Sequence, residues 1–129
     1  MLSPKYQFES ANYEFSTNLR AQVSVTLVID GARRTEVGYH NGETTSASIT
    51  EAMQDAVYKI TGLKPKINSI WGETRGRERQ ARQWVRLEQK DKAGKRIICY
   101  SDYNRGTDCF QAEVAAYIET INVMVRIKQ

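Results

Sequence analysis

The sequence predicts an α+β fold of two pseudo-repeated βββα units, with largely antiparallel sheets that are each covered by a helix. Strand-like alternation of apolar residues, two helix-like segments and the turn signals between them support this prediction. The apolar positions of the first helical segment recur 61 residues later in the second, from Ile49 with Phe110 to Ile60 with Ile121. We expect the two units, about 5–62 and 66–126, to bury one another as a single domain over residues 1–129.

The first half begins with three predicted strands. Tyr6 to Thr17 and Ala21 to Ile29 place apolar residues at alternate positions, most regularly in the second segment. The dipeptide Asp30-Gly31 is typical of a two-residue hairpin turn, because glycine accepts a positive φ without steric cost. Arg34 to Tyr39 then returns as the third strand.

A helix is predicted after these strands, from Ser48 to Thr61. Ser48 with Glu51 fits a capping box, in which the serine oxygen accepts a free backbone N–H of the first turn. Gly62 is expected to end the helix in a left-handed conformation, and Pro65 prevents its continuation.

The second half repeats this order, which gives six strands in all. The predicted strands are Ile67 to Glu73, Arg82 to Gln89 and Arg96 to Ser101, and the predicted helix is Phe110 to Met124. Asp108 with Gln111 resembles a second helix start. No Pro- or Ser-rich linker separates the halves.

Composition indicates an ordinary globular chain. Of the 129 residues, 40% are hydrophobic and 26% charged, which excludes wholesale disorder. No apolar run approaches the roughly 20 residues of a membrane helix, and the first residues lack the layout of a secretory signal. We therefore expect a cytoplasmic location. Cys99 and Cys109 are expected to be reduced and mostly buried thiols, with a disulfide between them as the alternative.

The net charge is +4, and much of the excess lies around the connection between two predicted strands. The arginines concerned are Arg75, Arg77, Arg79, Arg82 and Arg86. We interpret the segment 75–86 as a solvated loop and strand face, because no aromatic ladder or nucleic-acid motif accompanies it. A phosphate-tracking surface that binds nucleic acid is the alternative.

No catalytic or metal-binding constellation is present in the sequence. The single histidine, His40, lies in a turn and is expected to be an exposed polar residue. The acidic residues are dispersed, so we expect no metal, no cofactor and no enzymatic activity from this chain alone.

Two glycine-containing turns each lead into a predicted helix, His40 to Thr45 and Asn104 to Asp108. Helix N-termini present unpaired N–H groups and a partial positive charge, which suits a carboxylate or phosphate. From the residues alone, we favour the interpretation of both turns as simple connections that have good helix caps.

Several short motifs occur in a recognisable order across both halves. They are Val23 to Ile29 with Asp30-Gly31, Tyr39-His40-Asn41-Gly42, Gln80-Ala81, and Gly106-Thr107-Asp108 followed by Ala112, Ala115, Ala116, Tyr117, Ile121 and Asn122. In this arrangement the chain resembles the C-terminal regulatory domain of the 2-isopropylmalate synthase family, which includes citramalate synthases. It departs from the family at residues 43–46, where the family has Pro and an apolar residue.

The resemblance implies an allosteric domain that forms homodimers and binds leucine or isoleucine. End-product binding would inhibit a separate catalytic barrel, which 129 residues cannot supply. A basic nucleic-acid-binding module and a dimerisation domain without a ligand are the alternative hypotheses.

An amino-acid effector needs N–H groups for its carboxylate, an acceptor for its ammonium group and an apolar recess. By position, Asn41 and Gly42 are candidates for the first need and Asp108 for the second. The recess would be lined by Ile67 and Ile70, with Ala47 and Thr107 as further candidates. For the two isoleucines we favour the alternative interpretation, that they are core residues.

Overall fold

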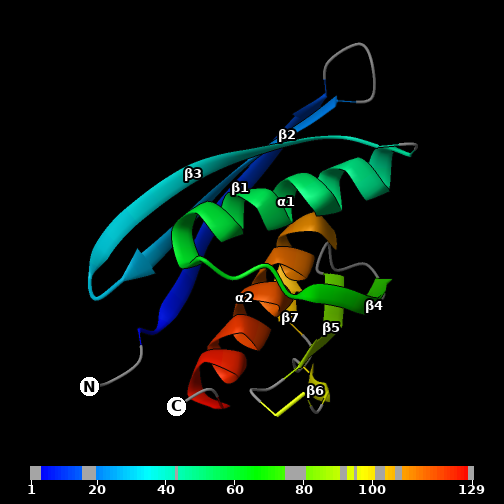
Figure 1. Ribbon diagram of the computed structural model, residues 1–129. Helices are drawn as coiled ribbons and strands as arrows, with labels where there is room; N and C mark the ends of the chain where they lie inside the picture. The colour runs from blue at the N-terminus through cyan, green and yellow to red at the C-terminus, as the bar shows by residue number, and fades with distance from the viewer. Residues whose placement is uncertain are drawn as a thin grey trace. The chain divides into compact units, whose positions relative to one another are not determined.

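The computed structural model describes residues 4–15, 20–42, 44–74, 81–90, 93–94, 96–100, 104–106 and 109–127. The chain divides into two compact units. One is Gln7–Lys64, and the other is Pro65–Gln129 together with Met1–Tyr6. Strands precede a long helix in both halves of the chain, so the predicted α+β class is confirmed, and the second half adds a fourth short strand to the predicted βββα order (Figure 1).

The first half contains β1 (Tyr6–Phe15), β2 (Arg20–Ile29), β3 (Ala32–Asn41) and α1 (Thr45–Thr61). Its three strands form a sheet in the order β1-β2-β3. Ile29 pairs with Ala32 across a two-residue turn, in which Asp30 has φ 51° and Gly31 has φ 82°. Positive φ at both central residues defines the predicted hairpin turn, so that prediction is confirmed.

The core of this unit lies between α1 and the sheet. Val23, Val25 and Leu27 of β2 have no exposed surface, whereas the residues between them are partly accessible. The apolar face of α1 packs on β2 and β3. Of its predicted positions, Met53, Ala56, Val57 and Ile60 are buried and Ile49 is half-buried. The strand and helix periodicities therefore identify the core correctly.

Gly38 of β3 lies directly against the backbone of α1. A Cβ atom at this position would come closer than 3.0 Å to the carbonyl oxygen of Ala52 and to the amide nitrogen of Ala56. Side-chain carbon atoms essentially never approach this closely. Only glycine therefore allows β3 and α1 to pack at this separation.

The second half contains β4 (Lys66–Thr74), β5 (Ala81–Lys90), β6 (Arg96–Tyr100), β7 (Asn104–Gly106) and α2 (Cys109–Ile127). β5 is central, with β4 on one side and both β6 and β7 paired antiparallel to it. The segment 104–106 was expected to be a turn. That prediction is wrong, because Ala81–Gln83 of β5 provide pairing partners for its backbone.

α2 packs on β5 and β7 and buries the face that the sequence predicts. The buried residues at the predicted positions are Phe110, Val114, Tyr117, Ile118 and Ile121. Asn122 of α2 also holds the backbone of Tyr6, which belongs to the same unit. Its side chain accepts a hydrogen bond from the Tyr6 N–H (2.9 Å) and donates one to the Tyr6 carbonyl (2.8 Å).

Two smaller expectations need correction. α1 begins at Thr45 rather than Ser48, because Thr44 is the N-cap and its side chain accepts the N–H of Ala47 at 3.2 Å. The C-terminal cap at Gly62 is as predicted, with φ 74°. Both cysteines are free; Cys99 is buried, but Cys109 is exposed, contrary to prediction.

Candidate functional site

The start of α1 is the part of the predicted effector site that the structure describes most fully. β3 ends at Asn41, which is exposed, and Gly42 follows. A Cβ on Gly42 would lie 2.5 Å from Oγ of Ser48, so glycine allows the chain to pass close to the first helical turn. The Ser48 hydroxyl is buried and donates to the carbonyl of Thr44 at 2.8 Å.

The predicted capping box at Ser48 is therefore wrong in its details. Ser48 lies inside the first turn, where its hydroxyl donates back along the helix instead of accepting a free N–H. Glu51 is exposed. The cap at Thr44 also uses the N–H of Ala47, so Ala47 has no free backbone donor for an effector, and its small side chain is exposed.

The structure brings together only part of the predicted site. Asn41, Gly42 and Ala47 are neighbours at the start of α1, within the unit Gln7–Lys64. Ile67 lies in β4 of the other unit and is half-buried, and the backbone of Ile70 lies in the same strand. Thr107 and Asp108 lie outside the described residues.

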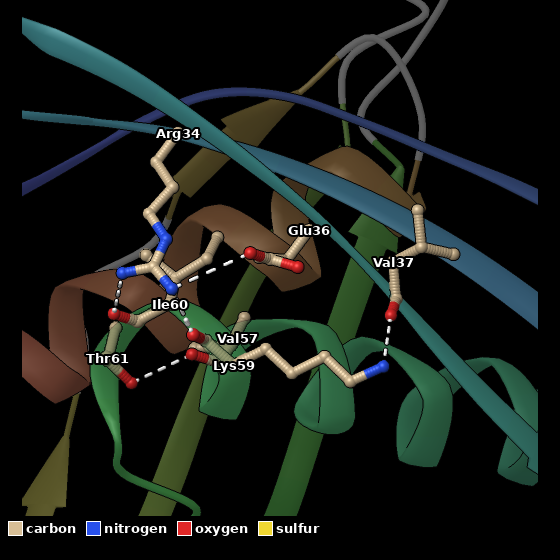
Figure 2. Close-up of polar contacts among 7 residues, drawn as sticks. All are labelled: Arg34, Glu36, Val37, Val57, Lys59, Ile60 and Thr61. Carbon is tan, nitrogen blue, oxygen red and sulfur yellow. Dashed lines mark hydrogen bonds and ion pairs between the residues drawn. The ribbon is translucent and has the colours of Figure 1, made fainter.

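The C-terminal end of α1 is held by an arginine from β3, as Figure 2 shows. The Arg34 guanidinium donates to the carbonyls of Lys59 (2.8 Å) and Ile60 (3.4 Å), and lies 3.6 Å from the Glu36 carboxylate. A cation at this position compensates the partial negative charge of the helix end. These contacts fix the C-terminal end of α1 against β3. The N-terminal end of the helix follows Asn41 and Gly42.

The outer edge of β3 is covered by two side chains of α1. Lys59 Nζ donates to the Val37 carbonyl at 2.6 Å, and Asp55 accepts the Tyr39 N–H at 3.2 Å (Figure 2 shows the first contact). Lys59 and Asp55 also form an ion pair at 3.5 Å. These residues satisfy backbone groups that a strand edge otherwise presents to solvent.

A surface hollow lies near the end of the same sheet. Its volume is about 380 Å³, and its lining residues are Glu14, Phe15, Arg20, Gln22 and Tyr39. The Arg20 guanidinium carbon is 5.0 Å from the centre of the Tyr39 ring, and Lys59 Nζ is 5.5 Å from it. These are cation–π distances, so the two cations help to fix the orientation of the tyrosine.

Other predicted features have simpler outcomes. Among the described residues, no group of three or more His, Cys, Asp or Glu side chains is arranged to hold a metal ion. No helix in the same parts of the chain is long and apolar enough to cross a membrane. His40 lies at the end of β3 and is half-buried, not fully exposed as predicted.

The arginine segment 75–86 is described only in part. Arg86 of β5 is half-buried and lies 3.8 Å from the Glu88 carboxylate. Residues 75–80 are outside the described ranges. Both interpretations of the segment stay predictions.

No family model matches the chain, and no curated protein matches it.

The hollow is the feature that sequence reasoning missed. Its residues come from three strands, and no motif connects Glu14 and Arg20 with Tyr39. The signal that could have found it is alternation: once β2 buries Ala21 and Val23, Arg20 and Gln22 must lie on the other face.

Proposed function

We propose that this chain is an amino-acid-binding regulatory and dimerisation domain of a 2-isopropylmalate synthase-type enzyme. Its effector is leucine or isoleucine, the end product of the pathway, and it acts in the cytoplasm. It carries out no catalysis itself; the catalytic barrel belongs to the parent enzyme. The family resemblance of the sequence supports this function, and the fold is compatible with it.

The observation that carries the proposal is that antiparallel strands precede a long helix in both halves, with helices that bury the same apolar pattern. At the start of α1, Gly42 allows the strand to reach the first helical turn closely, beside the N-terminal end of the helix. Such an end attracts a carboxylate. The sequence-based candidate for the acceptor of the effector's ammonium group, Asp108, lies outside the described residues.

Regulation then follows from linkage. An effector that binds one arrangement of the domain more tightly than another shifts the population toward that arrangement, by no more than its difference in affinity. A dimer passes the shift to both catalytic barrels, since each copy carries one. Leucine and isoleucine differ only in the position of a methyl group, worth about 1 to 3 kcal/mol in a fitted recess.

Calorimetry on the 129-residue chain tests the proposal. Leucine, isoleucine and valine are titrated separately, and sedimentation measures the oligomeric state with and without each. We expect micromolar binding of one of them and a dimer. If Asp108 accepts the ammonium group, Asp108→Ala should abolish the heat, and so should Asp108→Asn, which keeps the ability to cap a helix but loses the charge.

The outcomes separate the hypotheses. Absence of heat with all three amino acids, with the dimer intact, contradicts sensing and leaves a dimerisation domain. Salt-sensitive binding of mixed oligonucleotides instead would support the nucleic-acid alternative, since counterion release governs such contacts. Binding that survives in Asp108→Asn would show that Asp108 is a helix cap only.

A further inference from the structure

The hollow near the end of the first sheet lies on the face opposite α1. In β2, Ala21 and Val23 are buried, and the alternation of a strand puts Arg20 and Gln22 on the other side. In β3, Gly38 faces the α1 backbone, so Tyr39 also belongs to the open face. Figure 1 shows α1 running along one side of these strands.

This end of the sheet is also where the predicted effector residue Asn41 lies. Asn41 is the register partner of Arg20, and Tyr39 is the partner of Gln22. Residues directly opposite each other in antiparallel strands share a face. Asn41 therefore lies beside the hollow rather than beside the apolar face of α1.

The lining of the hollow has the charge pattern of a zwitterion site. Arg20 supplies a cation and Glu14 an anion, while Gln22 has an amide that both donates and accepts. Phe15 and Tyr39 are 38% and 43% exposed, which is a large aromatic area to leave in water. A volume of about 380 Å³ falls in the range of small-molecule sites.

We propose that this hollow binds an apolar α-amino acid, with its carboxylate on Arg20, its ammonium group on Glu14 and its side chain against Tyr39. The inference rests on the proposed function, because it gives the effector a location. It differs from the sequence-based expectation in placing the head group on side chains of the open face, not on the N-terminal end of α1. Gln22, which also lines the hollow, is then positioned to hydrogen-bond the head group.

Amide chemical shifts of the ¹⁵N-labelled chain test this location directly. Leucine and isoleucine are titrated, followed by two leucine analogues that lack one charge each, isopentylamine and 4-methylpentanoate. The amides of Arg20, Gln22 and Tyr39 should shift with an amino acid. Each analogue should bind at least about tenfold more weakly, because one charged contact is lost.

Variants identify the groups responsible. Arg20→Gln and Glu14→Gln should each weaken amino-acid binding by about tenfold. Arg20→Gln should leave the binding of isopentylamine unchanged, because this analogue has no carboxylate for Arg20 to bind. Arg33→Gln is the matched control, since Arg33 is an exposed arginine of the same unit whose partner is Glu9. The amide spectrum of each variant verifies that it is folded.

The result separates this inference from the proposed function. Shifts confined to Gly42, Thr44 and Ala47 would overturn the hollow as the site and leave amino-acid sensing intact. Shifts at the hollow that are indifferent to Arg20→Gln and Glu14→Gln would overturn the head-group assignment. No shift with either amino acid would overturn both.

Discussion

Replacing Gly38 with alanine tests the closest packing contact in the unit Gln7–Lys64. The added methyl group would lie within 3.0 Å of two backbone atoms of α1, the Ala52 oxygen and the Ala56 nitrogen. Ordinary contacts of a Cβ atom begin at about 3.4 Å. Because both obstructing atoms belong to the helix backbone, no side-chain rotation relieves the overlap, and α1 has to move away from β3 as a body.

The cost follows from this geometry. Overpacking of a well-packed core costs about 1 to 3 kcal/mol, and we place Gly38→Ala at the upper end, about 3 kcal/mol. With an m-value of about 1.5 kcal/mol/M, the urea midpoint should fall by about 2 M. Urea denaturation followed by circular dichroism measures both quantities. Arg33→Ala is the control on the same strand; its exposed ion pair contributes less than about 1 kcal/mol.

A double variant makes the test specific. Ala52→Gly removes the Ala52 methyl group but not its carbonyl oxygen, so combining it with Gly38→Ala should not restore stability. Recovery in the double variant would show that side chains set the contact. A loss below about 0.5 kcal/mol in Gly38→Ala alone would refute the close approach itself.

Three further predictions each concern one residue. Asn122→Ala removes both hydrogen bonds to the Tyr6 backbone and should lower the free energy of unfolding by about 2 to 3 kcal/mol in urea denaturation. Asp55→Ala removes the acceptor of the Tyr39 N–H and should speed hydrogen exchange of that amide by about five- to tenfold. Burial raises the pKa of the Cys99 thiol above its ordinary 9.0, so the free energy of unfolding should fall as pH rises above about 9, and less so in Cys99→Ala.

Each of the three has a control that isolates its cause. Asn12→Ala changes an exposed asparagine of β1 and should leave stability within about 0.5 kcal/mol. Asp55→Asn keeps an acceptor, so the Tyr39 amide should exchange more slowly in this variant than in Asp55→Ala. The Cys99 thiol keeps its proton to a higher pH in the folded state than in the unfolded chain. A free energy of unfolding that increases as the pH rises above about 9 would therefore contradict the raised pKa of Cys99. Cys109→Ala, at an exposed position, should leave the pH dependence unchanged.

The regular part of the fold was predictable because local signals agree with tertiary packing. The alternation of Val23, Val25 and Leu27 fixes which face of β2 is buried. Asp30-Gly31 fixes the register of β2 with β3, since Ile29 must then pair with Ala32. In these cases the same residues determine both the local conformation and the contact.

The predictions were wrong where two residues compete for the same role in a helix start, or where a strand pairs with a segment distant in the sequence. Thr44 and Ser48 are both good N-cap residues, and the choice between them depends on the packing of Gly42 against the first turn. β7 consists of three residues whose extended conformation comes from pairing with β5. Neither the packing nor the pairing can be predicted from the local sequence.

The candidate site shows the same division. Asn41 and Gly42 were found because they precede a helix, and the structure places Asn41 at the end of β3 and Gly42 against the first turn of α1. The hollow was not found, because Glu14, Arg20 and Tyr39 become neighbours only when three strands align. Thr107 and Asp108 lie outside the described residues, so their roles stay predictions.

The way α1 seals the outer margin of β3 limits how this sheet can grow. With the Val37 carbonyl and the Tyr39 amide already engaged by helix side chains, an incoming strand finds no continuous ladder there. Since β1 is the other outermost strand, any second molecule that lengthens this sheet must add along β1. If each copy can pair only along its β1 strand, two copies join and neither keeps an edge for a third. This favours a closed dimer over an open-ended fibre.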